Sequence, residues 1–202
     1  TIRRVAVRMG YRVALSTRRV RAVFQNKDDL AIFLDAGLVG AGSFALIRGS
    51  GVNLEEFVST PEPDGEPIVI LASRMLEQKG VREFLAAIAR LRCRAVVARF
   101  VLVGAPDPDN PSSIPEWQLQ KWHDNGAVEW WGRREDMPEV LRQASVVCLP
   151  TYYGEGLPKV LIEAAACGRP IVATDWPGCR EIVVDRENGL LVPPRDAGAL
   201  AD

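Results

Sequence analysis

The sequence predicts an α/β fold in which a parallel sheet is covered by helices on both faces. From residue 68 onward, short runs of strand length alternate with amphipathic helical patterns. These strand runs are apolar at nearly every position, as in Ile68–Ala72 (IVILA), so both faces of the sheet are expected to be buried. With 202 residues and 48% hydrophobic residues, the chain is large and apolar enough to form a substantial core.

The first fifty residues predict a smaller unit that precedes a linker. They contain, in order, a helix over 2–16, a strand over 20–24, a helix over 27–36 capped by Asn26, and a strand over 44–47. The stretch STPEPDGEP at 59–67 is rich in Pro, Gly and acidic residues, which is typical of a linker. We therefore expect three parts, at residues 1–50, 51–66 and 67–202.

The third part carries the regular alternation. Strands are expected over residues 68–72, 100–103, 128–131, 145–149, 171–173 and 190–192. Helices are expected over residues 81–92, 116–123, 137–144, 158–167 and, as a short turn, 179–184. Ligands of such sheets bind at the carboxyl ends of the strands, which directs attention to the loops at 73–80, 104 onward, 132–136 and 150–159.

The charge balance and the cysteines narrow the class of protein. Lys and Arg number 25 and Asp and Glu 26, so the net charge of −1 gives no reason to expect a nucleic acid partner. The first twenty-one residues nevertheless carry seven arginines and no acidic residue, which fits either an anionic partner such as a membrane surface or a solvated helix face. These arginines are Arg3, Arg4, Arg8, Arg12, Arg18, Arg19 and Arg21. The four cysteines form no C-x-x-C pair and are interpreted as reduced thiols of a cytoplasmic protein.

The stretch EGLPKVLIE places two carboxylates, Glu155 and Glu163, around the start of a predicted helix. Pro158 suits the first helical position, and Gly156 allows a ligand to approach the backbone closely. A helix N-terminus favours phosphate because it carries free N–H groups and about half a unit of positive charge. The two carboxylates suit neutral hydroxyl groups instead, such as those of a sugar or a ribose.

Cations are expected at the same edge of the sheet. Arg74 and Lys79 follow the strand at 68–72 and would neutralise a diphosphate, although surface cations would have the same pattern. Arg133 and Arg134 follow the strand at 128–131. A base or ribose of a ligand could lie against this loop, or the two charges could simply be solvated. Asp136 is expected to cap the helix that follows.

Other kinds of site have weaker support. Asp107-Pro108-Asp109 could ligate a divalent metal, but its proline-rich setting favours a turn. His123 is the only histidine and has no ligand-spaced partner, so it is interpreted as structural or surface. No G-x-G-x-x-G or Walker A pattern is present, which disfavours a sugar-nucleotide epimerase, an NAD-dependent dehydrogenase or a P-loop enzyme.

Taken together, five motifs resemble those of the retaining glycosyltransferases of family 4, the "group 1" glycosyltransferases, and stand in the family's order. They are QNKDDL (25–30), GSGVN (49–53), SRMLEQKG (73–80), the run from EGLPKVLIE to GCREIV (155–183), and NGLLVPP (188–194). The pair of glutamates with seven residues between them is the most specific of these signals.

The resemblance implies the GT-B arrangement of two Rossmann-like domains with a cleft between them. Residues 1–50 would then be the end of the N-terminal acceptor domain, and 67–202 the donor domain without its C-terminal tail. Glu155, Arg74 and Lys79 would be catalytic. The nucleotide-sugar-binding residues that it implies are Gly51, Arg74, Lys79, Arg133, Gly156, Leu157, Pro158, Val160 and Glu163.

The resemblance also implies a reaction. A sugar would pass from a nucleotide donor to a lipid-linked or polysaccharide acceptor, with retention of the anomeric configuration and without a metal. The donor would be UDP-linked, because UDP-sugars are the most frequent donors in the family. The pathway would be bacterial surface-glycan assembly, such as lipopolysaccharide biosynthesis. Because most of the acceptor domain is not in this chain, we expect no turnover by the chain alone. A sugar-nucleotide-binding module without catalysis stays open as the alternative. The basic first helix would suit a cytoplasmic enzyme at the inner face of the membrane.

Overall fold

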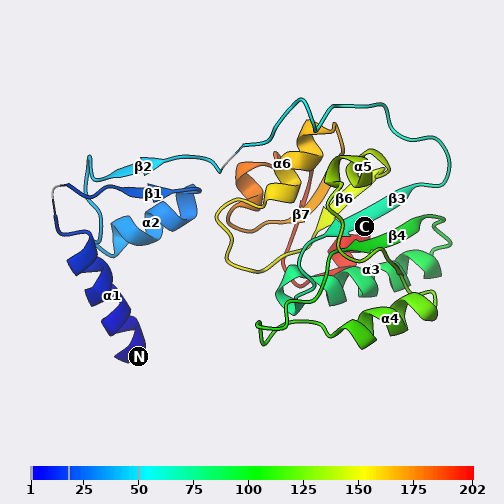
Figure 1. The fold of residues 1–202 in the computed structure, drawn as a ribbon, viewed down its shortest axis with the longest axis horizontal. Helices are drawn as coiled ribbons and strands as arrows, with labels where there is room; N and C mark the ends of the chain where they lie inside the picture. The colour runs from blue at the N-terminus through cyan, green and yellow to red at the C-terminus, as the bar shows by residue number, and fades with distance from the viewer. Residues whose placement is uncertain (1, 18, 50) are drawn as a thin grey trace.

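In the computed structural model, which describes residues 2–17, 19–49 and 51–202, the strands form two parallel sheets. Residues 2–17 and 19–46 form a small unit beside a larger body (Figure 1). Ser50 of the GSGVN motif, Arg18 and the side chain of Arg4 lie outside the described residues. No helix in the described ranges has the length and apolarity needed to cross a membrane.

The small unit contains two helices and two strands in the predicted order. They are α1 (Ile2–Ala14), β1 (Ala22–Phe24), α2 (Lys27–Asp35) and β2 (Phe44–Leu46). Strand β1 pairs in parallel with β2. The predicted cap of α2 is confirmed, because the backbone N–H of Asp29 donates to Asn26 Oδ1 at 2.7 Å. Helix α1 ends two residues before the predicted Ser16, and its described arginines are exposed.

The larger body confirms the predicted parallel sheet. Its six strands follow the order β5-β4-β3-β6-β7-β8. They are β3 (Ile68–Ala72), β4 (Arg99–Val103), β5 (Glu129–Trp130), β6 (Val146–Leu149), β7 (Ile171–Thr174) and β8 (Gly189–Val192). This is the doubly wound order of a Rossmann fold, and its direction reverses between β3 and β6. The loops that follow these two strands are therefore where a ligand is expected.

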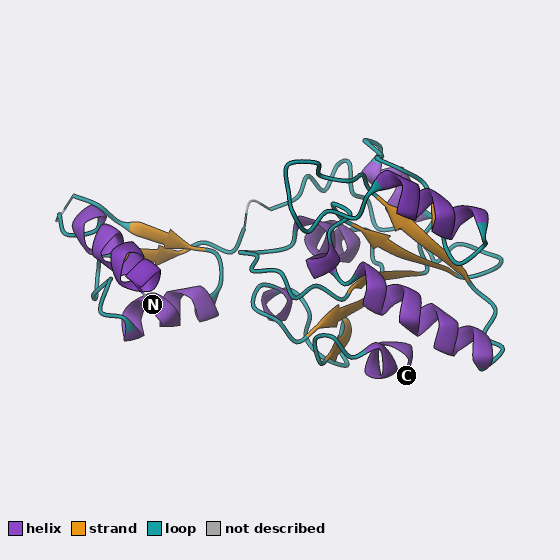
Figure 2. Ribbon diagram, turned by 90° about the horizontal axis from the view of Figure 1, so that it is seen from below, coloured by secondary structure: helices purple, strands orange, loops and turns teal. Residues whose placement is uncertain are grey.

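Helices cover both faces of this sheet (Figure 2). They are α3 (Val81–Cys93), α4 (Glu116–Asp124), α5 (Met137–Arg142), α6 (Lys159–Ala166), α7 (Ala197–Ala201) and the 3₁₀ turns η1 (Glu77–Lys79) and η2 (Cys179–Glu181). Alternate residues of one strand enter different cores, because successive side chains point to opposite faces. In β3, Ile70 packs with α5 and α6, whereas Leu71 packs with α3 and α4.

The helix starts differ in detail from the predictions. Pro158 is the N-cap of α6, with ψ of 111°, and Lys159 is the first helical residue, so the prediction of Pro158 at the first helical position is wrong. The extended ψ of Pro158 is incompatible with a helical turn. Asp136 occupies the N-cap position of α5 without a side-chain cap bond, because its carboxylate accepts from Arg134 at 2.7 and 2.5 Å.

The segment between the two sheets packs on the larger body. Phe57 is buried in the core that α5 and α6 cover. The Arg169 guanidinium donates to the carbonyls of Thr60 and Pro61, at 2.8 and 3.0 Å, and to the Thr60 hydroxyl. The residues predicted as a linker are thus held to the larger body by a buried side chain and by hydrogen bonds.

Candidate functional site

A cavity of about 510 Å³ opens at the carboxyl ends of β3 and β4 and beside α6. Among the predicted site residues, Arg74, Arg133, Val160 and Glu163 line it. Its other lining residues are Ala72, Ser73, Val103, Gly104, Ala105, Pro106, Asp107, Pro108, Arg134 and Met137. Loops that are far apart in sequence meet here because all strands of the sheet run in one direction.

Arg74 enters the cavity already paired with a carboxylate. Its Nη1 lies 2.6 Å from Asp107 Oδ2. Hydrogen bonding to Asp107 raises the pKa of Arg74, and this gain outweighs the opposing effect of burial. The turn predicted at Asp107–Asp109 is confirmed, since the Asn110 N–H donates to the Asp107 carbonyl at 2.9 Å. Any anion that binds Arg74 must therefore compete with Asp107.

Lys79 is paired in the same way, with the first glutamate of the EGLPKVLIE stretch. Its Nζ lies 2.5 Å from Glu155 Oε1, and the Lys79 side chain is only 9% exposed. The Thr151 hydroxyl donates to the same carboxylate oxygen at 3.2 Å. Lys79 also lies over the ring of Tyr153, 5.3 Å from its centroid. Lys79 and Glu155 thus form a partly buried, hydrogen-bonded group next to the cavity rather than in its lining.

Gly80 allows the loops after β3 and β6 to come together. It has a φ of 79°, and a Cβ at this position would lie 2.1 Å from the Pro150 carbonyl oxygen. Only glycine combines this left-handed backbone with such a close approach. The close contact sets Lys79, immediately before Gly80, next to the residues that follow Pro150, including Glu155.

Glu163 lies on the buried face of α6, 8% exposed, and points to the cavity that it lines. Lys159, one helical turn earlier, lies 3.2 Å from Glu163 Oε1 and is itself largely exposed. The apolar neighbours Leu161 and Ala164 pack into the core and hold the helix against the sheet. The sequence predicted two carboxylates around the start of this helix, and the structure places the second of them on the inner face of the helix.

The remaining predicted residues do not line the cavity. Gly156, Leu157 and Pro158 form the turn before α6. Leu157 contacts the segment that leaves the small unit, since a Cβ at Gly49 would lie 2.5 Å from its Cδ2. Gly51 has a φ of 71°, and a Cβ at this position would have no heavy atom within 4 Å other than those of its chain neighbours.

Sequence reasoning missed three groups at this site. Asp107 was weighed only as a metal ligand or a turn residue, although it follows a strand end at the same edge as Arg74. Thr151 and Tyr153 carry no motif that sets them apart, and only the fold brings them to Lys79 and Glu155. The interpretation of His123 as structural or surface is confirmed, because it is exposed and its Nδ1 accepts from the Trp130 N–H at 3.2 Å.

Within the described ranges, no three His, Cys, Asp or Glu side chains converge in a way that could hold a metal. The cations and the two glutamates instead offer an arrangement for a ligand with phosphate groups and hydroxyl groups. All four cysteines are free thiols, as predicted.

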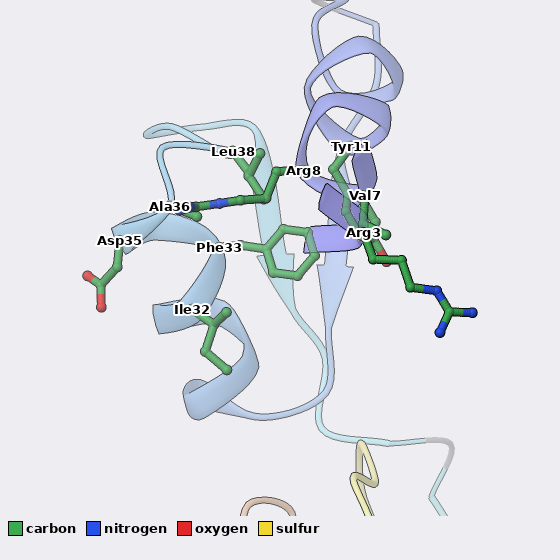
Figure 3. A pocket seen from close by; sticks show the side chains of 9 residues that line it. All are labelled: Arg3, Val7, Arg8, Tyr11, Ile32, Phe33, Asp35, Ala36 and Leu38. Carbon is green, nitrogen blue, oxygen red and sulfur yellow. The ribbon is translucent and has the colours of Figure 1, made fainter. Parts of the chain in front are cut away.

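A second, apolar cavity of about 760 Å³ lies in the small unit between α1 and α2. Val7, Tyr11 and Phe33 point into it, and Arg3 and Arg8 stand at its rim (Figure 3). Tyr11 and Phe33 meet edge to face with their ring centroids 5.0 Å apart. Ile32 nevertheless remains 62% exposed, so this apolar surface is only partly covered by the described residues.

The chain is similar to several glycosyltransferases. It is 32% identical over 193 residues to the N,N'-diacetylbacillosaminyl-diphospho-undecaprenol alpha-1,3-N-acetylgalactosaminyltransferase of Campylobacter jejuni, covering 89% of this chain and 49% of that protein. It is also 32% identical over 167 residues to the phosphatidyl-myo-inositol mannosyltransferase of Mycolicibacterium smegmatis, covering 79% and 42%. The chain thus spans about half the length of these curated relatives.

Solved structures share its fold. Anabaena Alr3699/HepE, in complex with UDP and glucose, superposes with a TM-score of 0.78 at 22% identity, covering 96% of this chain and 55% of that one. Sucrose-phosphate synthase from Thermosynechococcus elongatus superposes with a TM-score of 0.74 at 30% identity, covering 89% and 46%. Residues 66–202 match the family described as "Glycosyl transferases group 1". The chain therefore belongs to the group 1 glycosyltransferases, and its six-stranded parallel sheet with flanking helices corresponds to part of a GT-B fold.

Proposed function

We propose that this chain forms the donor side of a retaining glycosyltransferase that takes its sugar, a hexosyl or N-acetylhexosaminyl group, from a nucleotide donor, most simply a UDP-sugar. The observation that carries the proposal is the convergence of Arg74, Arg133 and Glu163 on one cavity where the sheet order reverses. Membership of the family supplies the reaction class. The donor domain in this proposal comprises residues 67–202.

The donor would extend across the cavity toward the turn before α6. Glu163 accepts from the ribose hydroxyls, and Arg133 lies against the base. Arg74 and Lys79 hold the diphosphate, with the N–H groups around Gly156 and Leu157 beside them. This placement matches the chemistry of each group, since the buried carboxylate faces neutral hydroxyls and the cations face the anion.

In the reaction, the bond between the anomeric carbon and the nucleoside diphosphate breaks, and a bond from the acceptor oxygen forms on the same face. The proton of the acceptor hydroxyl passes to the departing diphosphate. Negative charge develops on the departing diphosphate. Arg74, Lys79 and the N-terminus of α6 would stabilise that charge electrostatically, and in this proposal no metal takes part. Glu155 would lie near the donor sugar and orient Lys79, with which it is paired.

The acceptor is proposed to be lipid-linked or a polysaccharide, in surface-glycan biosynthesis at the cytoplasmic face of a membrane. The names of the relatives support a lipid-linked acceptor, since they include an undecaprenol-linked and a phosphatidylinositol substrate. The exposed arginines of α1 would suit contact with an anionic membrane surface. Residues 1–50 would complete an acceptor domain whose remaining part packs on the apolar cavity between α1 and α2.

Calorimetric titration of the chain with UDP and uridine tests the donor site. We expect Glu163→Ala to weaken the affinity for both ligands, because a ribose hydroxyl pair loses its acceptor, at a cost of roughly 1–3 kcal/mol. Lys159→Ala is the matched control, since it removes the partner of Glu163 but leaves the carboxylate in place. Equal affinity of wild type and Glu163→Ala for UDP would refute the assignment of Glu163 to the ribose.

The diphosphate site is tested by Lys79→Ala, which should weaken UDP binding more than uridine binding, because uridine lacks the phosphates. An equal loss for both ligands would place Lys79 away from the diphosphate. A turnover assay with UDP-sugars then separates a catalytic chain from a binding module, and we expect binding without turnover by this chain alone. NMR of the glycosidic product of the longer enzyme checks retention.

A further inference from the structure

We propose that Asn26 is a positioning residue that seats the turn before α6 against the small unit. Asn26 is fully buried, although most side chains of the small unit are exposed. A buried amide needs partners for both its oxygen and its nitrogen. Capping of α2 uses only the oxygen, through the Asp29 N–H. The partners of the nitrogen point to the second role.

The Asn26 amide nitrogen reaches across the fold to the turn before α6. It donates to the Gly156 carbonyl at 2.9 Å and to the Glu155 carbonyl at 3.4 Å. It also donates to Asp29 Oδ2 at 2.9 Å, which orients the amide. Because Glu155 and Gly156 start the turn that leads into α6, Asn26 holds the backbone of that turn in place without entering the cavity.

Charged contacts surround this bridge. The Lys27 N–H donates to Glu181 Oε1 at 3.1 Å, and Arg48 Nε lies 2.9 Å from Glu181 Oε2. Arg180 Nη2 lies 2.9 Å from Asp28 Oδ1. The start of α2 and the end of β2 therefore contact η2 at the same interface, and Asn26 is its buried centre.

Capping of α2 alone does not explain why residue 26 is an asparagine rather than a serine or an aspartate. Ser and Asp cap helices as well as Asn does. Neither has the N–H₂ group that donates to the Gly156 and Glu155 carbonyls. Asp would in addition place a carboxylate against those two carbonyl oxygens. Substitution of Asn26 by Ser or Asp thus removes the bridge and keeps the cap.

The rate of disulfide formation between cysteines placed on the two sides of the Asn26 bridge measures how firmly the bridge holds, and the measurement needs no nucleotide. A Cβ at Gly156 would lie 3.2 Å from Gln25 Cβ, within a few tenths of an ångström of disulfide geometry. Gln25→Cys with Gly156→Cys, in a Cys93→Ser background that removes the exposed native thiol, should therefore oxidise readily with oxidised glutathione. Gln25→Cys with Gly154→Cys is the matched control. A Cβ at Gly154 would have no heavy atom within 4 Å other than those of its chain neighbours, so it does not approach Gln25.

We expect the Gly156 pair to close faster than the Gly154 pair. Adding Asn26→Ser should slow closure of the Gly156 pair roughly two- to tenfold, as the net free energy of one hydrogen bond predicts. Asn26→Asp should slow it similarly, and circular dichroism should show α2 retained in both. An unchanged rate in Asn26→Ser, or equal rates for the two cysteine pairs, would overturn the proposal.

The consequence for ligand binding rests on the proposed function. Asn26→Ser should weaken UDP binding roughly two- to tenfold and leave uridine binding unchanged, because the turn lies on the diphosphate side. If wild type binds no UDP, the proposed donor site fails, while the trapping rates still decide the role of Asn26. Equal UDP affinity in Asn26→Ser and wild type would overturn the link between this bridge and the donor turn.

Discussion

Both cations that are proposed to hold the diphosphate are neutralised by carboxylates in this structure. Arg74 is paired with Asp107 and Lys79 with Glu155, at 2.6 and 2.5 Å. The two pairs differ in exposure, since the Arg74 side chain is 53% exposed and that of Lys79 only 9%. A bound diphosphate can replace Asp107 at little cost, because exposed ion pairs contribute about 0.2–1 kcal/mol.

This pairing predicts that Asp107→Asn strengthens UDP binding. Removing the competing carboxylate should raise the affinity roughly two- to fivefold, which corresponds to the free energy of an exposed ion pair. Uridine affinity should not change, because the gain depends on phosphate. Calorimetry with both ligands measures the effect, and Asp109→Asn, in the exposed part of the same turn, is the control. Weaker UDP binding by Asp107→Asn would mean that Asp107 supports the ligand instead.

The cysteines differ sharply in their expected reactivity. Burial raises the pKa of Cys148 to about 12, and burial together with the nearby Glu155 charge raises the pKa of Cys179 to about 12. Burial also raises the pKa of Cys167, whereas Cys93 is exposed. Because the thiolate is the reactive form, iodoacetamide at pH 7.5 should add one group to the folded chain, at Cys93. Intact mass and peptide mapping check this, and a second adduct before unfolding would contradict it.

At the scale of elements, the edge strand β5 is joined to β4 by an ion pair between neighbouring strands. Arg99 donates to both carboxylate oxygens of Glu129, at 2.7 and 2.8 Å. The Trp131 indole N–H also donates to Glu129, at 3.0 Å. Hydrogen bonding from Arg99, with a smaller contribution from Trp131, lowers the pKa of Glu129 below its usual 4.5. A strand of two residues has few ladder bonds, so these side-chain bonds matter for its position.

Glu129→Gln should lower the free energy of unfolding by about 0.5–1 kcal/mol at pH 7. A carboxyl with a depressed folded-state pKa stabilises the fold above its unfolded pKa, and this stabilisation disappears as pH falls through the folded-state value. The difference between variant and wild type should therefore shrink as the pH falls below the ordinary glutamate pKa of 4.5. Urea unfolding at pH 7 and at acidic pH values measures it. Glu135→Gln is the control, since Glu135 is exposed and lies 3.5 Å from Arg133, and a pH-independent loss at Glu129 would contradict the ion-pair explanation.

Across the whole molecule, the hydrophobic core is unevenly distributed. Both clusters of buried apolar side chains lie in residues 57–183, on the two faces of the larger sheet. In the small unit, apolar side chains such as Val5 and Ile32 are mostly exposed. Among the described residues, the Asn26 bridge and polar contacts at η2 join the two parts, and neither buried apolar cluster extends into the small unit.

This distribution predicts two levels of hydrogen-exchange protection. Amides of the central strands, such as those of Ile70, Val101 and Val147, should exchange only by global unfolding. Amides of β1 and β2, such as those of Val23 and Ala45, should exchange faster by at least about tenfold, through local opening. Native-state exchange followed by NMR tests this, and equal protection of both sheets would show that the small unit unfolds together with the larger body.

The sequence by itself determined the elements and the edge of the sheet where the site lies. The strand Ile68–Ala72 was predicted with the bounds that the structure shows, and the other strands of the larger sheet to within one residue at each end, because an apolar run of this length between turn residues is a local signal. Arg74, Arg133 and Glu163 were predicted at one edge, since parallel strands align their carboxyl ends. Two predictions about helix starts were wrong, namely Pro158 as the first helical residue and Asp136 as a side-chain cap. Both depend on a single backbone angle or side-chain rotamer.

Only the tertiary structure decided which polar and charged groups contact one another. Arg74 is separated from Asp107 by 33 positions, Lys79 from Glu155 by 76, and Asn26 from Gly156 by 130. No local pattern encodes these contacts, because they depend on the order of strands in the sheet and on how the small unit meets the larger body. Asn26 is the clearest case, since its cap was readable from the residues that follow it, whereas its bridge to Gly156 exists only once the fold has brought the two turns together.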